Sequence, residues 1–157
     1  MKEIKLTRGK VALVDDKDYV SFSSFRWRAS ETKSGFYAVR QIYISKYKTK
    51  PCFLHRLILG EPEGLIVDHI NGDSLDNRRK NLRTCTHQQN IANRKISKNN
   101  TTGFKGVVRD RKGFRAEIKV WGKKIHLGSY KNPIDAAHSY DLASKKYFKN
   151  FARPNFV

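Results

Sequence analysis

The most constraining feature of the sequence is a strict alternation of apolar and polar side chains over residues 114–127, interrupted once at a Gly122-Lys123 turn. The apolar set is Phe114, Ala116, Ile118, Val120, Ile125 and Leu127. The polar set, in which we include Trp121, is Arg115, Glu117, Lys119, Trp121, Lys124 and His126. Successive side chains of a strand point to opposite faces. The pattern therefore predicts an antiparallel hairpin with one apolar and one cationic face.

The flanking residues predict a third strand and a helix around this hairpin. Residues 104–111 supply the strand, with three cations available to its polar side: Lys105, Arg109 and Arg111. Asn132 is suited to cap a helix and Pro133 to its first position. Apolar residues then recur at helical spacing: Ala136, Tyr140, Ala143 and Tyr147. We expect the helix to cover the apolar sheet face and to leave the cationic face open.

A second pattern occupies residues 65–94. An apolar strand ends in Asp68-His69, an Asx-Gly turn follows, and residues 82–85 form another short strand before Thr86, which is suited to cap a helix that runs to Arg94. This ββα arrangement would bring Asp68, His69 and Asn90 together, although they are far apart in the sequence.

These side chains predict a hydrolytic metal site. An Asp carboxylate and an Asn carbonyl, from Asp68 and Asn90, are hard oxygen ligands that suit Mg²⁺. A neutral His69 could take a proton from water as a general base. Asn81 is predicted to pin the loop behind His69, because an amide side chain can both donate to and accept from backbone. The alternative makes Asn71, Asn77 and Asn81 ordinary turn residues.

The rest of the chain predicts an α+β protein. Residues 1–54 contain short aromatic and β-branched runs that indicate a hairpin-rich leader, and a helical turn is possible at residues 55–59. A role of His55 in the active site stays open, with a structural or surface role preferred. The polar residues 95–102 are predicted to be a linker between a core at 55–94 and a second domain at 103–157.

Charge indicates the partner. The net charge is +19, and it is unevenly distributed: residues 1–60 carry 13 Lys and Arg against 5 Asp and Glu, residues 61–94 carry 5 against 5, and residues 95–157 carry 15 against 4. A surplus of this size attracts polyanions through counterion release. Duplex DNA is the expected partner. A membrane is not expected, since no basic amphipathic helix or lipidation motif is present.

The run "HRLIL...VDHINGDSLDNRRKNLRTCTHQQNIANR" strongly resembles the HNH endonucleases of the ββα-metal type, especially those of phages and homing elements. The resemblance implies that His69 is the general base, Asp68 and Asn90 are metal ligands, and Asn81 is the structural asparagine of the catalytic site. Many of these proteins carry histidine at the last ligand position, so Asn90 favours Mg²⁺ or Mn²⁺ over nickel or zinc. Asn93 could substitute for Asn90, and His87 and Arg94 are predicted phosphate contacts.

Residues 103–156 resemble the APETALA-type, or ethylene-response-factor, DNA-binding domain through their "GV-R", "RAEI", "LG-Y", "AA-YD-A" and "FA-NF" signatures. That family binds the major groove with its sheet. The resemblance implies seven DNA contacts here: Lys105, Arg109, Arg111, Arg115, Lys119, Trp121 and Lys124.

Together these observations predict a metal-dependent DNA endonuclease of the homing type that nicks DNA. We expect it to act as a monomer on DNA, without a small-molecule cofactor, in the cytoplasm of a bacterial host and encoded by a phage or mobile element. One alternative is a DNA-binding regulator with an inactive nuclease core. An RNA-binding protein, supported only by charge, is another.

Overall fold

The computed structural model describes residues 1–60 and 62–156. The chain divides into two compact units, Met1–Thr86 and His87–Val157. Both mix strands and helices, and every strand pairing between named strands is antiparallel. The predicted α+β fold class is confirmed. No helix in the described residues is long and apolar enough to cross a membrane.

The first unit contains three small sheets with short helices between them. Strands β1 and β2 form a hairpin that leads into helix α1, and strands β3, β4 and β5 form a three-stranded sheet in that order. Strands β6 and β7 then pair with each other. The bounds are β1 Lys2–Lys5, β2 Val11–Val14, α1 Asp16–Phe22, β3 Arg28–Thr32, β4 Gly35–Ser45, β5 Lys48–Phe53, α2 Leu54–Ile58, β6 Ile66–His69, η1 Arg79–Asn81 and β7 Leu82–Cys85.

The predicted hairpin-rich leader is present with one difference. One β-branched and aromatic run of this leader, residues 10–20, is a strand only over Val11–Val14, and Asp16–Phe22 is helix α1. The acidic residues Asp16 and Asp18 lie in its first turn, where negative charge is favourable. The helical turn expected near His55 is helix α2.

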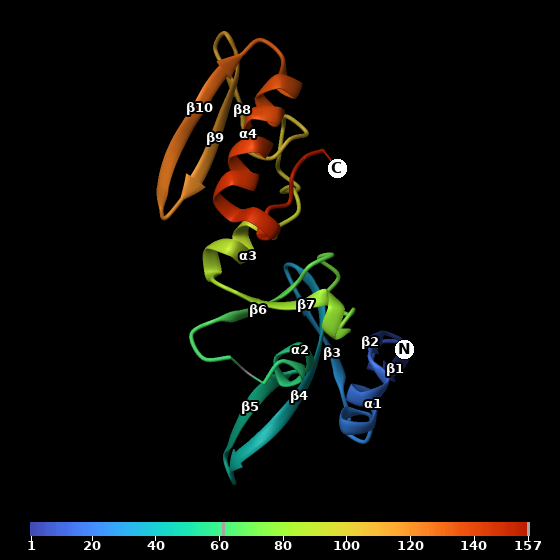
Figure 1. Cartoon of the computed structure of the whole chain (residues 1–157). Coiled ribbons are helices and arrows are strands. Elements are labelled where there is room, and N and C mark those ends of the chain that lie inside the picture. The colour runs from blue at the N-terminus through green and yellow to red at the C-terminus, as the bar shows by residue number, and fades with distance from the viewer. Residues whose placement is uncertain (61, 157) are drawn as a thin grey trace. The chain divides into compact units, whose positions relative to one another are not determined.

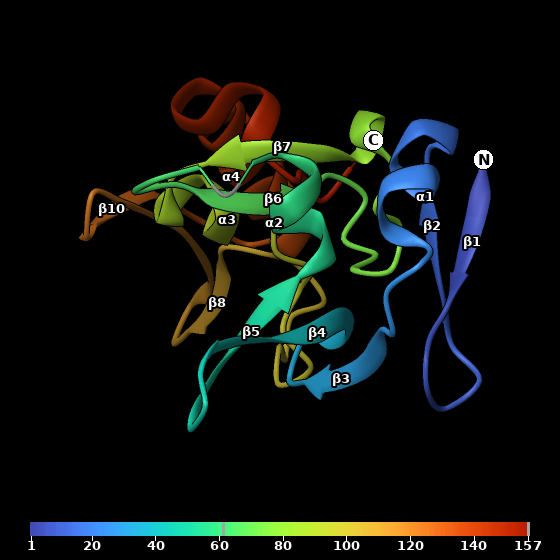
Figure 2. The same cartoon turned by 90° about the horizontal axis from the view of Figure 1, so that it is seen from below.

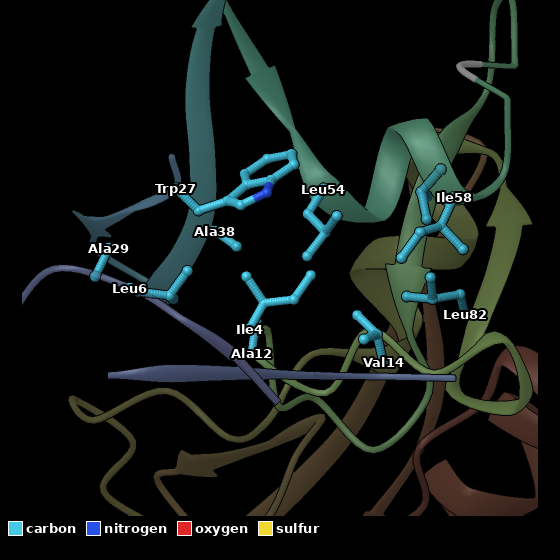
Figure 3. Packing of buried hydrophobic residues seen from close by; sticks show 11 residues of the cluster. Ile4, Leu6, Ala12, Val14, Trp27, Ala29, Ala38, Leu54, Ile58 and Leu82 are labelled. Atoms are coloured by element: carbon cyan, nitrogen blue, oxygen red, sulfur yellow. The ribbon is translucent and has the colours of Figure 1, made fainter. Parts of the chain in front are cut away.

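One hydrophobic core holds this unit together (Figure 3). Trp27 is only 2% exposed at its centre, and its indole nitrogen donates to the Phe22 carbonyl at 2.9 Å. Leader side chains, among them Leu54 at the start of α2, share this core with Val67 of β6 and Leu82 of β7. The β6–β7 hairpin therefore rests on the leader and has no separate core of its own.

The second unit is a three-stranded sheet packed on one long helix. The strands run in the order β10-β9-β8, and α4 lies against all three (Figure 1). The Asn132 side chain accepts from the Ile134 amide at 2.9 Å, which is the predicted N-cap. The bounds are α3 His87–Asn93, β8 Val107–Asp110, β9 Gly113–Val120, β10 Lys123–Tyr130, α4 Pro133–Phe148 and η2 Lys149–Phe151.

The predicted alternation in β9 is confirmed, because Ala116, Ile118 and Val120 are all buried. The prediction of the buried face of α4 is wrong at the C-terminal end of the helix. Tyr147 is 42% exposed, and Phe148 is buried instead. The buried face of α4 advances by four residues at a time, through Ala136, Tyr140, Ser144 and Phe148.

The turn between β9 and β10 also differs from the expectation. Its two central residues are Trp121 and Gly122, with φ of 50° and 78°, rather than Gly122 and Lys123. Positive φ at both positions belongs to a type I′ turn, whose twist matches that of the strands it joins. Trp121 therefore projects from the hairpin tip, 80% exposed, and not from the sheet face.

Candidate active site

His69 lies at the end of β6, facing the β3–β4–β5 sheet and helix α2. Its ring is 6% exposed and packs against the rings of Tyr37 and His55, with centroid distances of 6.1 and 5.0 Å. Its Nε2 atom lies 3.4 Å from Oδ1 of Asn77. A ring held on several sides in this way has a fixed orientation, which a general base requires.

Burial lowers the pKa of His69. The hydrogen bond of His69 to Oδ1 of Asn77 and the charges of Asp68, Asp73 and Asp76 act in the opposite direction but do not cancel the effect of burial. Because the pKa falls from an ordinary value near 6.5, the imidazole is neutral at physiological pH and can accept a proton.

Asp68 precedes His69 on β6 and is 7% exposed. Its Oδ2 atom accepts from Nε and Nη2 of Arg83 at 3.1 and 3.0 Å. Arg83 is the residue directly opposite Asp68 in the β6–β7 register, so the hairpin itself creates the pair. Arg83 belongs to no motif of the sequence, and counting from the predicted Asn71-Gly72 turn would place Leu75 opposite Asp68. The observed pair depends on the pairing of His69 with Leu82, which the turn residues do not indicate.

Asn81 ties together the loop that follows His69. Its Oδ1 accepts from the Asn71 amide at 3.0 Å, and its Nδ2 donates to the Asp76 carbonyl at 2.8 Å. Its own carbonyl accepts from the Ile70 amide at 2.8 Å. Asn81 thus ties the loop at Ile70, Asn71 and Asp76. Its role as the structural asparagine of a catalytic site stays a prediction.

The same loop is anchored to the leader. The Asn77 amide donates to the Leu13 carbonyl at 2.8 Å, and the Leu13 amide donates to the Leu75 carbonyl at 2.9 Å. Arg79 adds hydrogen bonds to both carboxylate oxygens of Asp18 on α1. Residues 1–22 therefore support the position of the loop, and through it the site.

Two side chains beside His69 were given too little weight by the sequence analysis. Asn77, considered there only as a turn residue, is 1% exposed and is the hydrogen-bond partner of His69. His55 is 7% exposed, and its Nδ1 atom is buried without a hydrogen-bond partner among the described residues. Burial, helped by the charges of His69 and Arg56, lowers the pKa of His55 to about 3. The fold places both residues at the site, whereas sequence spacing gives no signal for either.

The predicted helix-borne residues lie in the second unit. His87, Asn90 and Asn93 are on α3, and Arg94 follows its last turn. Asn93 is 7% exposed. The convergence of Asn90, or of Asn93 in its place, with Asp68 stays a prediction.

The sheet of the second unit carries fewer free cations than expected. Val108 pairs with Arg115 and Arg109 pairs with Phe114, so Arg109 shares the helix-covered face. Its guanidinium lies 5.6 Å from the centre of the Phe114 ring. The expectation that Arg109 projects from the open face is therefore wrong. Val107 pairs with the buried Ala116, and Arg109, two residues further along the strand, points to the same face as Val107.

Two further cations differ from the expectation. The Lys105 ammonium donates to the Ala92 and Arg153 carbonyls at 2.8 and 3.0 Å, so it does not project from the sheet. Burial lowers the pKa of Lys105 to about 8. Arg111 lies in the turn between β8 and β9.

The open face does hold Arg115, Lys119 and Lys124, but acids accompany them. Glu117 lies 3.5 Å from Arg115 and 3.2 Å from Lys124, and Asp110 lies 3.8 Å from Arg115. His126, opposite Glu117 in the register, shares this face. The open face therefore carries charges of both signs, with a small positive surplus. Lys119 is exposed and takes no part in these ion pairs.

Asp68, which precedes His69 on β6, would supply a carboxylate oxygen to a bound ion. In the described part of the chain, no group of three or more His, Cys, Asp or Glu residues is placed to hold a metal. A soft-metal centre built from several thiolates or imidazoles is therefore not present there. One carboxylate with an amide oxygen suits Mg²⁺ or Mn²⁺, which keep several waters and take phosphate oxygens from a substrate.

Comparison with known proteins shows similarity to nucleases. Residues 52–92 match the HNH endonuclease family. Over 156 residues the chain is 29% identical to an uncharacterized HNH endonuclease of Acanthamoeba polyphaga mimivirus, covering 96% of this chain and 77% of that protein. Over 70 residues it is 35% identical to Protein 3.8 of Escherichia phage T7, covering 43% of this chain and 58% of that protein. The chain therefore contains an HNH endonuclease domain and is a nuclease.

Proposed function

We propose that this nuclease is a metal-dependent endonuclease that nicks duplex DNA, with His69 as the general base. The observation that carries the proposal is the environment of His69, which lies at a strand end within the matched family region, next to an acid and with its pKa lowered by burial. A buried, oriented and neutral imidazole beside a carboxylate is suited to activate water.

In the proposed reaction, His69 accepts a proton from a water molecule while the water oxygen attacks a backbone phosphorus. The bond from phosphorus to the 3′ oxygen breaks, which leaves a 5′ phosphate and a 3′ hydroxyl after that oxygen is protonated by solvent. A placed general base contributes about 10²- to 10⁴-fold to such a rate. Asn77 and Asn81 would act by positioning, the first on the ring and the second on its loop.

Asp68 and Asn90 are the proposed ligands of Mg²⁺ or Mn²⁺. When bound, the ion would stabilise negative charge on the phosphoryl oxygens and on the leaving oxygen. Arg83 would hold the Asp68 carboxylate in place, since its Nε and Nη2 atoms both donate to Oδ2. This assignment requires α3 to bring Asn90 to β6, as expected for the ββα arrangement of the resembled family.

The second unit is proposed to supply DNA binding in the manner of an APETALA-type domain. Its order of three strands and one helix agrees with that proposal. After the register is taken into account, Arg115, Lys119 and Lys124 are the preferred contacts on the sheet face, with Trp121 and Arg111 in the two turns. His87 and Arg94 stay proposed phosphate contacts.

We further propose that the protein acts as a monomer on DNA and is of the homing type, encoded by a phage or other mobile element and active in the cytoplasm of its host. One ββα centre in each chain favours cutting a single strand. The viral and phage sources of the two relatives support the genetic setting.

The rival function is DNA binding without cleavage, and a plasmid assay separates the two. Wild-type protein with Mg²⁺ should convert supercoiled plasmid to the open circle. His69→Ala should lower the rate at least about 10²-fold, the loss of a general base, while duplex affinity stays unchanged. If the wild-type protein binds but never cuts with Mg²⁺ or Mn²⁺, the regulator is the better assignment. Equal loss of binding and cleavage in His69→Ala would refute the general-base role.

A further inference from the structure

The β4–β5 hairpin is longer than the sheet to which it belongs. Strand β3 pairs with β4 only over residues 35–39, whereas β4 continues to Ser45 and returns as β5 from Lys48. Residues 40–51 therefore form a two-stranded ribbon beyond the end of β3 (Figures 1 and 2). Of its residues 41–51, all except Ile42 are exposed.

The tip of this ribbon carries large apolar side chains in solvent. Tyr43, Ile44 and Tyr47 are 80%, 56% and 90% exposed. Single exposed apolar residues are common on protein surfaces, but three within five residues at the end of a projecting hairpin are not explained by packing in their own unit. They add nothing to the core in which Trp27 and Leu54 lie.

The same ribbon is strongly basic. Residues 40–51 contain Arg40, Lys46, Lys48 and Lys50 and no acid. This contrasts with the open sheet face of the second unit, where Asp110 and Glu117 pair with the cations. The Lys46 ammonium lies 5.5 Å from the centre of the Tyr47 ring, so charge and aromatic surface are combined at the tip.

We propose that this ribbon is a second DNA-binding element, which enters the major groove of the duplex. The groove is about 12 Å wide and admits a two-stranded ribbon. The lysines would contact phosphates along its walls, and Tyr43 and Tyr47 would contact base edges and sugars within it. The inference rests on the proposed function only in taking duplex DNA as the ligand.

Charge complementarity selects DNA over a protein partner. An exposed apolar tip could also join two copies of the chain, but two such tips would bring two groups of at least three lysines together with no acid in either ribbon to compensate. Like charges placed face to face are destabilising in an interface. Duplex DNA suits both features of the tip, because its phosphates can pair with the lysines and its groove can accommodate the aromatic rings.

Two double variants of the full-length chain test the ionic and the aromatic contacts separately. Lys46→Gln with Lys48→Gln should reduce the slope of log affinity against log salt by about 2, at roughly 0.9 for each lost phosphate contact. Tyr43→Ser with Tyr47→Ser should lower affinity about tenfold or more without changing that slope, since stacking and apolar contacts release no counterions. The matched control is Lys17→Gln with Lys33→Gln, which removes two exposed lysines of the same unit and should leave the slope nearly unchanged.

A footprint identifies the groove. Guanine N7 faces the major groove, so wild-type protein should protect a patch of guanines from dimethyl sulfate, and the tyrosine variant should lose part of that protection. An unchanged affinity in both double variants would overturn the proposal. So would a wild-type dimer, measured by sedimentation without DNA, that the tyrosine substitutions convert to a monomer.

Failure of this inference and failure of the proposed function give different results. If the chain nicks plasmid and the hairpin variants bind and cut like wild type, the ribbon is not a DNA contact and the nuclease assignment stands. If the chain never cuts but the hairpin variants lose affinity as described, the ribbon assignment stands alone.

Discussion

The imidazole rings of His55 and His69 lie with their centroids 5.0 Å apart, both buried. One comes from the short helix α2 and the other from the end of β6. Charge on either ring would repel charge on the other in a space that already disfavours ions. The two histidines are therefore expected to be neutral together, and protonation of either would work against the fold around the site.

This relationship predicts a pH-dependent stability. The pKa of His55 is about 3 in the folded chain against 6.5 ordinarily, so between these values the unfolded chain holds a proton that the folded chain does not. The free energy of unfolding should then fall as pH falls from 6.5 toward 3, by up to about 1.4 kcal/mol per pH unit for such a group. His55→Gln should flatten the fall without abolishing it, since His69 contributes in the same direction.

Urea unfolding followed by the fluorescence of the buried Trp27 measures this slope at a series of pH values. His126→Gln, which alters an exposed histidine of the second unit, is the matched control and should leave the slope intact. A His55 variant with the wild-type slope would show that burial of this ring does not depress its proton affinity.

The hydrogen bonds that Asn81 makes to its loop predict that substituting this residue affects cleavage more than DNA binding. In Asn81→Ala the Asn71 amide and the Asp76 carbonyl lose their partner, which should cost about 1–3 kcal/mol of stability. Asn81→Asp keeps an acceptor for the Asn71 amide but cannot donate to the Asp76 carbonyl. Both variants should lower kcat for nicking more than they raise KM, because they loosen His69 rather than the DNA contacts. Kinetics at a temperature where each variant is fully folded measures this, and a change confined to KM would contradict it.

Much of this architecture could be predicted from local pattern. The Asn132 cap, the alternation in β9, and the strand pair that ends in Asp68 and His69 all follow from neighbouring residues, and the structure contains each of them. What could not be predicted depends on tertiary packing. His55 reaches His69 only because α2 packs beside β6 and β4, and the face of Arg109 is decided by a register that strand periodicity alone leaves open.

That register leads to a prediction about DNA affinity. Arg115→Ala with Lys119→Ala should weaken binding and reduce the salt slope, by about one for each phosphate contact that is lost. Arg109→Ala removes the same charge from the helix-covered face, above the Phe114 ring, and should change the slope little. Fluorescence anisotropy with a labelled duplex across a salt series measures both. Equal effects of Arg109 and Lys119 single variants would mean that DNA does not distinguish the two faces.

The close approach of Gly106, just before β8, to Tyr140 of α4 predicts a severe effect of substitution at this glycine. A Cβ atom on Gly106 would lie 1.9 Å from Cδ2 of Tyr140, and φ at Gly106 is 71°. Gly106→Ala should therefore combine the left-handed backbone cost of about 1–2 kcal/mol with an overpacking cost of about 1–3 kcal/mol. Gly122→Ala is the matched control, because φ there is 78° and nothing lies within 4 Å of the added carbon, so only the backbone cost applies. Hydrogen exchange of the amides in β8 and β9 reports the difference locally, and protection in Gly106→Ala should fall well below that in Gly122→Ala. Similar protection in the two variants would mean that Tyr140 moves aside at little cost, and that this contact does not fix how the helix lies on the sheet.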